Sequence, residues 1–394
     1  MRSFRHHPVW IYILCCLSML SLAFFVNIIS VYLTTLSAEF GGAAGLTKEQ
    51  LGRIAVFSFA GVIAGILSCG ALADRWGARI FAAAGNWMIA AGMILCSFAP
   101  SYPAFLACMF VIGFGAGCLD LILTPVVVAL YPERKSAVLN WLHSFYPIGG
   151  IVTILICGYA IQRGWNWRHA VFGLSILPLA AGVGMILSKL PALVLEEGRR
   201  QKARDLVRKP VFILLVLGLL LAGIPEIGIN VWLPAYSELE LKLPAWQANL
   251  GLVLFTSAMA VGRILNGWLS RRINVRYLMI AGCLVCIVFY LLASLAADPG
   301  VSWMSCVVIG FGVSCLWPGI LSLTSERFPR AGASVYAVLS AVANVGGMLT
   351  PWGIGLGGDV FGLRPAMAMV GFFPLLMIVL LLVLRRYRGA EPNS

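Results

Sequence analysis

Three charged side chains stand inside long apolar stretches, and their types and positions are the best suited to chemistry in this chain. Asp120 lies in VIGFGAGCLD, Glu226 lies in GIPEIG, and Arg263 lies in a third apolar run. A charge in the hydrocarbon core of a membrane is costly, so such residues face a protein interior or a cavity. We predict that Asp120 and Glu226 carry protons. Arg263 either attracts an anionic substrate or neutralises a carboxylate, for example by pairing with Glu226 to join two helices.

The composition predicts an all-α membrane protein. Hydrophobic residues make up 61% of the 394 residues, charged residues make up 11%, and the mean hydropathy is +0.94. A run of about 18 apolar residues is long enough to cross a bilayer, and it must be helical to satisfy its backbone. The chain has twelve such runs: 9–35, 54–72, 80–99, 103–130, 137–162, 169–188, 210–236, 247–268, 277–297, 301–324, 335–356 and 366–386.

A repeat indicates that the chain was built from two copies of one unit. VIGFGAGCLD begins at Val111 and VIGFGVSCLW begins at Val308, 197 positions later, and several glycines recur at the same offset. Small residues at equal places predict equal close helix contacts. We therefore expect two six-helix bundles, residues 1–190 and 210–394, joined by a cytoplasmic linker at 191–209. The tenth position differs, because Asp120 in the first copy becomes Trp317 in the second.

The basic charge predicts an orientation in the membrane. The net charge is +13, but only six of the 28 Lys and Arg residues fall in the loops of one side: Lys48, Arg53, Arg163, Arg168, Lys242 and Arg364. Positive loops stay in the cytoplasm, so we expect a multi-pass protein of the cytoplasmic (inner) membrane with both termini cytoplasmic. The charge then belongs to the membrane surface and argues against a nucleic-acid partner.

The residues that most cofactors and enzymes need are scarce. The chain has four histidines and no nucleotide-binding or metal-ligand motif, which argues against an enzyme, a cofactor, a bound metal or an ATP drive. All eleven cysteines fall in apolar runs, where cysteine acts as a small buried side chain. These features leave transport as the most plausible activity.

A loop motif carries a family resemblance that covers the whole chain. Residues 70–79 read GALADRWGAR, and residues 267–276 form their counterpart, GWLSRRINVR. The first loop resembles the G-x-L-A-D-R-x-G-x-[RK] signature of the major facilitator superfamily, which implies paired six-helix bundles with a cytoplasmic latch. By this resemblance we expect Asp74 to meet the start of helix 11, Arg75 to meet Glu326, and Glu133 to pair with Arg271 or Arg272. The full predicted gate is Gly70, Asp74, Arg75, Gly77, Arg79, Glu133, Gly267, Arg271, Arg272, Arg276 and Glu326.

Helices 4 and 7 resemble the fucose-permease-like, sugar-carrying branch of that superfamily. In that branch a helix-4 carboxylate takes part in proton coupling, which implies this role for Asp120; helix 7 matches E-x(5)-W-L-x-x-Y from Glu226 onward. Pro225 and its flanking glycines predict a break in helix 7 at which a ligand binds backbone groups. The predicted substrate contacts are Asn27, Asn140, Trp141, His143, Tyr146, Glu226, Asn230, Trp232, Arg263, Trp317 and Asn344.

These features together favour a secondary carrier, a monomer in the lipid bilayer, that moves a small polar solute by alternating access. A sugar in symport with a proton is the leading hypothesis. The alternative is a proton-coupled exporter of drugs or metabolites, because Pro147-Ile148-Gly149-Gly150 resembles the end of an antiporter motif.

Overall fold

The computed structural model describes residues 7–191, 206–328 and 333–387, without the side chains of 70–76, 135–137, 140, 333 and 334. Its described part consists of helices and connecting loops, and twelve helical segments are long and apolar enough to cross a membrane, which confirms the predicted architecture. The helices are α1 (Pro8–Leu22), α2 (Phe24–Gly41), η2 (Gly42–Ala44), α3 (Lys48–Trp76), α4 (Ala78–Ser97), α5 (Tyr102–Leu130), α6 (Lys135–Gln162), α7 (Trp167–Leu174), α8 (Ile176–Leu187), α10 (Pro210–Leu239), α11 (Ala245–Leu269), α12 (Val275–Leu295), α13 (Pro299–Val313), α14 (Leu316–Arg327), α15 (Ala333–Phe361), α16 (Leu363–Val370) and α17 (Phe372–Arg386).

Four of the spans consist of two helices in succession, and proline explains three of these breaks. The breaks fall at Ser175, at 314–315 and at Gly371, each three or four residues before a proline. A proline has no amide hydrogen for the carbonyl four residues earlier, so the ladder of hydrogen bonds is interrupted there. In the first span the break is at Ala23, whose carbonyl oxygen accepts a hydrogen bond from the Asn27 side chain at 2.7 Å.

The predicted break in helix 7 is wrong. The helix α10 runs without interruption from Pro210 to Leu239, although it contains Pro225 and Pro234. The segment around Pro225 is buried, and the Tyr290 hydroxyl of α12 donates a hydrogen bond to the Pro225 carbonyl at 2.6 Å. Neighbouring helices can hold a membrane helix together across a proline, and here they do.

The repeated glycines make the repeated contacts that the sequence predicts. A Cβ atom on Gly113 would overlap the carbonyl oxygen of Ser58, and one on Gly310 would overlap that of Phe255. Ser58 and Phe255 are themselves 197 positions apart, so the same helix pair is packed in the same way twice. Both contacts bring two backbones together, which only glycine permits.

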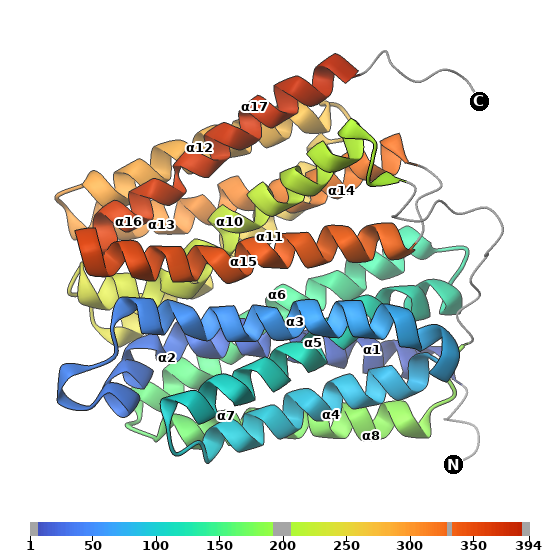
Figure 1. Ribbon diagram of the computed structural model, residues 1–394, viewed down its shortest axis with the longest axis horizontal. Coiled ribbons are helices and arrows are strands. Elements are labelled where there is room, and N and C mark those ends of the chain that lie inside the picture. The colour runs from blue at the N-terminus through green and yellow to red at the C-terminus, as the bar shows by residue number, and fades with distance from the viewer. Residues whose placement is uncertain (1–6, 192–205, 329–332, 388–394) are drawn as a thin grey trace.

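The helices α3 and α15 lie side by side along the middle of the molecule, where the first six spans meet the last six (Figure 1). The helix α1 begins and α17 ends at the same end of the bundle (right in Figure 1), which we call the terminal end. The opposite end, which we call the far end, contains the start of α3 and the end of α15. These two ends are the places where a passage between the two sets of helices would open or close.

Candidate functional site

An ion pair within the membrane forms the centre of the candidate site. Arg263 of α11 donates from Nη2 to Oε1 of Glu226 of α10 at 3.2 Å. The side chain of Glu226 is 10% exposed and that of Arg263 is 30% exposed. Both partners have spare capacity, because Glu226 Oε2 and Arg263 Nε are buried without a hydrogen-bond partner among the described residues. The pairing expected as one alternative is therefore formed, but it is incompletely satisfied.

Side chains from the first six spans face this ion pair. Tyr146 of α6 lies within electrostatic range of Glu226, of Arg263 and of Asp120 in α5. His143, one turn earlier in α6, lies 3.4 Å from the Thr124 hydroxyl and within electrostatic range of Arg263. The structure thus brings together five of the predicted residues: Tyr146 lies within electrostatic range of all three charges of the apolar runs, and His143 lies within range of Arg263.

Two predicted amides lie on helices of the central region: Asn27 of α2 packs beside Gly150 of α6, and Asn230 of α10 is in contact with α2. Asn27 is 4% exposed, and its Oδ1 atom has no hydrogen-bond partner among the described residues. Asn230 accepts a hydrogen bond from the Ser30 hydroxyl at 3.4 Å, so the two sets of helices are in polar contact at this level. Asn27 therefore keeps an unused acceptor, and Asn230 brings a second amide one helical turn after Glu226.

The remaining predicted contacts have varied surroundings. Trp317 lies beside Gly223 of α10, since a Cβ atom on that glycine would be 3.5 Å from its ring, and Asn344 donates to the Ser340 carbonyl at 2.8 Å. Trp232 is completely buried and donates to the Pro351 carbonyl at 2.9 Å, so it packs against α15 and has no surface for a solute. Trp141 is 67% exposed. The side chain of Asn140 lies outside the described part of the structure.

The predicted gate at the terminal end is described only in part. Gly77 has a φ of +79° and precedes α4, a conformation that favours glycine. Arg272 lies over the Trp268 ring at 5.4 Å, and no ion pair joins Glu133 to Arg271 or Arg272 in the described residues, so that predicted pairing is not formed. Three predicted gate side chains are exposed: Arg79, Arg271 and Glu326. Gly267 is exposed as well, and a Cβ atom on it would meet nothing within 4 Å. Arg276 is buried at the start of α12. Residues 70–76, with Gly70, Asp74 and Arg75, lie outside the described side chains.

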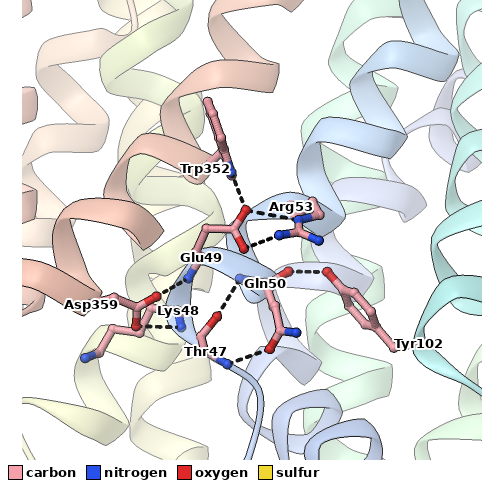
Figure 2. Close-up of polar contacts among 8 residues, drawn as sticks. All are labelled: Thr47, Lys48, Glu49, Gln50, Arg53, Tyr102, Trp352 and Asp359. Atoms are coloured by element: carbon pink, nitrogen blue, oxygen red, sulfur yellow. Dashed lines mark hydrogen bonds and ion pairs between the residues drawn. The ribbon is translucent and has the colours of Figure 1, made fainter.

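The sequence analysis missed a polar cluster at the far end (Figure 2). Glu49 of α3 accepts a hydrogen bond from Trp352 of α15 at 2.6 Å and pairs with Arg53 at 2.5 Å. Asp359, near the end of α15, accepts hydrogen bonds from two backbone amides of α3. The T-x-x-Q pattern at Thr47–Gln50 is typical of a helix start, but nothing in the sequence indicates that Trp352 and Asp359 lie beside it.

Comparisons with known proteins agree with this architecture. The family model described as Major Facilitator Superfamily matches residues 13–351. The cis,cis-muconate transport protein of Acinetobacter baylyi is 25% identical over 381 residues, 89% of each chain, and the gentisate transporter of Corynebacterium glutamicum is 24% identical over 84% of this chain and 80% of that one. A solved structure of a D-xylose-proton symporter has a TM-score of 0.79 and 14% identity, covering 95% of this chain and 97% of that chain.

Proposed function

The chain belongs to the Major Facilitator Superfamily of membrane transporters, and we propose that it is a proton-coupled secondary carrier for a small organic carboxylate. Arg263 carries this proposal, because it places a cation with unused hydrogen-bond donors where the two sets of helices meet. The names of the two relatives support the same substrate class, since muconate and gentisate are carboxylates.

The guanidinium of Arg263 is suited to bind a carboxylate. It has five N–H donors in a planar fork that fits two carboxylate oxygens at once. Among the described residues only Nη2 has a hydrogen-bond partner, Glu226 Oε1, and the side chain is partly exposed. A substrate carboxylate would take over the place of Glu226 on this fork. Glu226 would then lose its counter-ion in a buried position, and uptake of a proton would make it neutral.

The groups around the ion pair suit a flat, unsaturated acid. Tyr146 and Trp317 offer aromatic faces, and Asn27 offers a buried amide oxygen that lacks a donor. Aromatic pairs are stabilised by about 0.5–1.5 kcal/mol beyond the burial of their area. A ring or a conjugated chain attached to the carboxylate would therefore be bound better than an aliphatic chain of equal size.

Asp120 is the proposed proton site of the first six spans. It is half-buried in α5, has no hydrogen-bond partner among the described residues, and lies within electrostatic range of Tyr146, which also faces Arg263. A proton taken up at Asp120 or Glu226 would offset the charge that an anionic substrate brings into the membrane. In this proposal substrate and proton move together, with the termini in the cytoplasm.

The test compares acids with their neutral isosteres on the purified carrier. Thermal shift with benzoate and benzamide, and with nicotinate and nicotinamide, isolates the carboxylate from the ring. We expect stabilisation by the acids alone, and we expect Arg263→Gln to remove the preference. Equal stabilisation by acid and amide would refute carboxylate recognition. Uptake by right-side-out vesicles separates import from the alternative of export.

A sugar remains the second candidate, and the amides favour it. Asn27, Asn230 and Asn344 lie at or near the same interface, and amides with a carboxylate can bind hydroxyl groups. D-Glucose and D-xylose in the same thermal-shift assay decide between the two classes. Stabilisation by a sugar and not by benzoate or nicotinate would replace the carboxylate by a polyol as substrate.

A further inference from the structure

The polar cluster at the far end joins the two sets of helices, and none of its residues belongs to the candidate substrate site. We propose that Asp359, Glu49 and Trp352 form a latch that holds the far end closed, and that the latch lies on the α3–α15 side only. This proposal rests on alternating access, the transport mode proposed above. It adds the positioning residues that set the cost of opening one end.

Asp359 completes the hydrogen bonding of the α3 N-terminus from the other set of helices. The first amides of a helix have no partner within the helix. In α3, the amide of Gln50 is bound by the Thr47 hydroxyl at 3.1 Å, in a capping box. The amides of Lys48 and Glu49 are bound by the two carboxylate oxygens of Asp359, at 2.9 and 2.8 Å (Figure 2). Of the three amides that have no partner within the helix backbone, two therefore depend on α15.

Each of the two helix ends is bound by a charged side chain from the other helix. The Asp359 carboxylate meets the positive N-terminal end of α3, while the Lys48 ammonium donates to the Gly358 carbonyl at the negative C-terminal end of α15, at 2.9 Å. Both contacts are favoured by the helix dipoles. Glu49, held by Arg53 in its own helix, adds the hydrogen bond from Trp352. The bonds made by Asp359, by the Lys48 ammonium and by Trp352 all cross the boundary and would all break if α3 and α15 moved apart here.

The backbones beneath the latch are in direct contact. A Cβ atom on Gly52 would overlap the Pro351 carbonyl oxygen, and one on Gly355 would overlap that of Lys48. Such close packing leaves no space for a solute or for water between the helices. A separation of an ångström or two would therefore lengthen every hydrogen bond of the latch together.

The equivalent boundary on the other side of the molecule, between α6 and α11, has no such latch among its described side chains. At the 197-residue offset, Glu49 corresponds to Trp246, Asp359 to Gln162 and Trp352 to Leu155. The helix α11 begins after Pro244 with no side-chain cap. Asn249, which corresponds to Gly52, is buried against Gly158 with an amide that has no hydrogen-bond partner among the described residues.

A third boundary, between α2 and α10, has weaker links. The Thr34 hydroxyl donates to Glu238 at 3.0 Å, and the Ser30 hydroxyl donates to Asn230 at 3.4 Å. Neither bond has a charged donor, and neither pairs with the unpaired backbone groups of a helix end. Opening the far end thus breaks several charge-assisted bonds at α3–α15. It breaks two hydroxyl bonds at α2–α10, one of them to a carboxylate, and no polar bond among the described residues at α6–α11.

Hydrogen exchange on the full-length carrier in nanodiscs tests the latch without any substrate. We expect Asp359→Asn to raise the exchange of the amides at 48–52 by about tenfold, as for the loss of a helix cap. Exchange at 245–249, the start of α11, should not change, and neither should the thermal unfolding midpoint. Asp359→Glu, which keeps the carboxylate, should restore most of the protection.

The matched control is Gln162→Ala, at the equivalent place on the α6–α11 side, which should leave exchange at both boundaries unchanged. Equal effects of Asp359→Asn and Gln162→Ala would overturn the one-sided latch. So would unchanged protection of 48–52 in Asp359→Asn. Because no substrate is present in this experiment, a failure of the carboxylate proposal would leave its result intact, and the reverse also holds.

Discussion

Residues 111–120 and 308–317 have nearly the same sequence and different structures. The first copy lies within the unbroken α5, whereas the second spans the junction of α13 and α14 at 314–315. The shared glycines pack in the same way in both copies, as Gly113 against Ser58 and Gly310 against Phe255 show. The duplicated glycines thus preserve the packing of the bundle, while the few changed positions distinguish the two halves.

Two changed positions explain the difference in structure. Gly117 touches the backbone of Val62, but its counterpart Ser314 has a hydroxyl that donates to the Phe311 carbonyl at 2.6 Å and accepts from Asn266 at 3.1 Å. Pro318, which follows the second copy, cannot donate to the Ser314 carbonyl. The helix therefore ends at Val313 and begins again at Leu316.

The largest effect should come from the tenth position of the repeat. Asp120→Asn removes the proposed proton site and should abolish accumulation driven by a pH gradient, while counterflow exchange continues. Trp317→Phe, at the equivalent place in the second copy, should keep pH-driven accumulation. The measurement is uptake of labelled benzoate or nicotinate into vesicles with and without an imposed gradient; accumulation by the Asp120→Asn carrier would refute this role.

The next effect concerns the seventh position. Gly117→Ser inserts a side chain where even a Cβ atom would overlap the Val62 carbonyl oxygen. Such overpacking costs about 1–3 kcal/mol. The thermal unfolding midpoint in detergent should fall accordingly. Gly267→Ala is a suitable control, because a Cβ atom on Gly267 meets nothing within 4 Å. Equal loss in both variants would show that the close contact at Gly117 does not matter.

The reverse position in the second copy should tolerate change better. Ser314→Ala keeps the Cβ atom that the site already holds and loses two hydrogen bonds of the hydroxyl, a cost of about 1 kcal/mol. Asn266 keeps its bond to the Gly262 carbonyl at 2.8 Å, so its amide is not left unpaired. When the unfolding midpoints of the two variants are measured side by side, Gly117→Ser should be less stable than Ser314→Ala.

The smallest effect should come from joining α13 and α14. Pro318→Leu introduces the residue found at the equivalent position, Leu121, and supplies the missing amide. We expect a stability change within about 1 kcal/mol, since one backbone hydrogen bond is gained and the bend is fitted to its neighbours. Increased hydrogen-exchange protection at 316–320 would show that the break is due to the proline; unchanged protection would assign it to Ser314.

Sequence reasoning predicted the bundle well because apolar length and glycine spacing are local signals. The repeat predicted that Gly113 and Gly310 make equivalent close contacts, and the structure supplies their partners, Ser58 and Phe255. The break assigned to Pro225 was wrong, because whether a proline ends a helix depends on neighbours such as Tyr290 that the local sequence does not reveal. The break before Pro318 was not predicted either, although Ser314 and Pro318 explain it in the structure.

The candidate site was predictable where the residue type is unusual for its surroundings. Charges in apolar runs are rare, and this identified Asp120, Glu226 and Arg263 in the sequence. In the structure all three lie within electrostatic range of Tyr146. Trp232 fitted a family pattern but packs against α15, since a tryptophan serves a core as readily as a cavity. Asp359 and Trp352 could not be placed, because their partners lie about 300 positions away in the chain and no local pattern encodes such a pairing.

The two amides capped by Asp359 also set a limit on the order of assembly during synthesis. Lys48 and Asp359 are 311 positions apart, and at about 5–20 residues per second a ribosome needs about 15–60 s to cover that distance. During this time the first turn of α3 has its own capping box and no carboxylate from α15. The first six spans therefore enter the membrane with one helix end unfinished, and only the arrival of the eleventh span completes it.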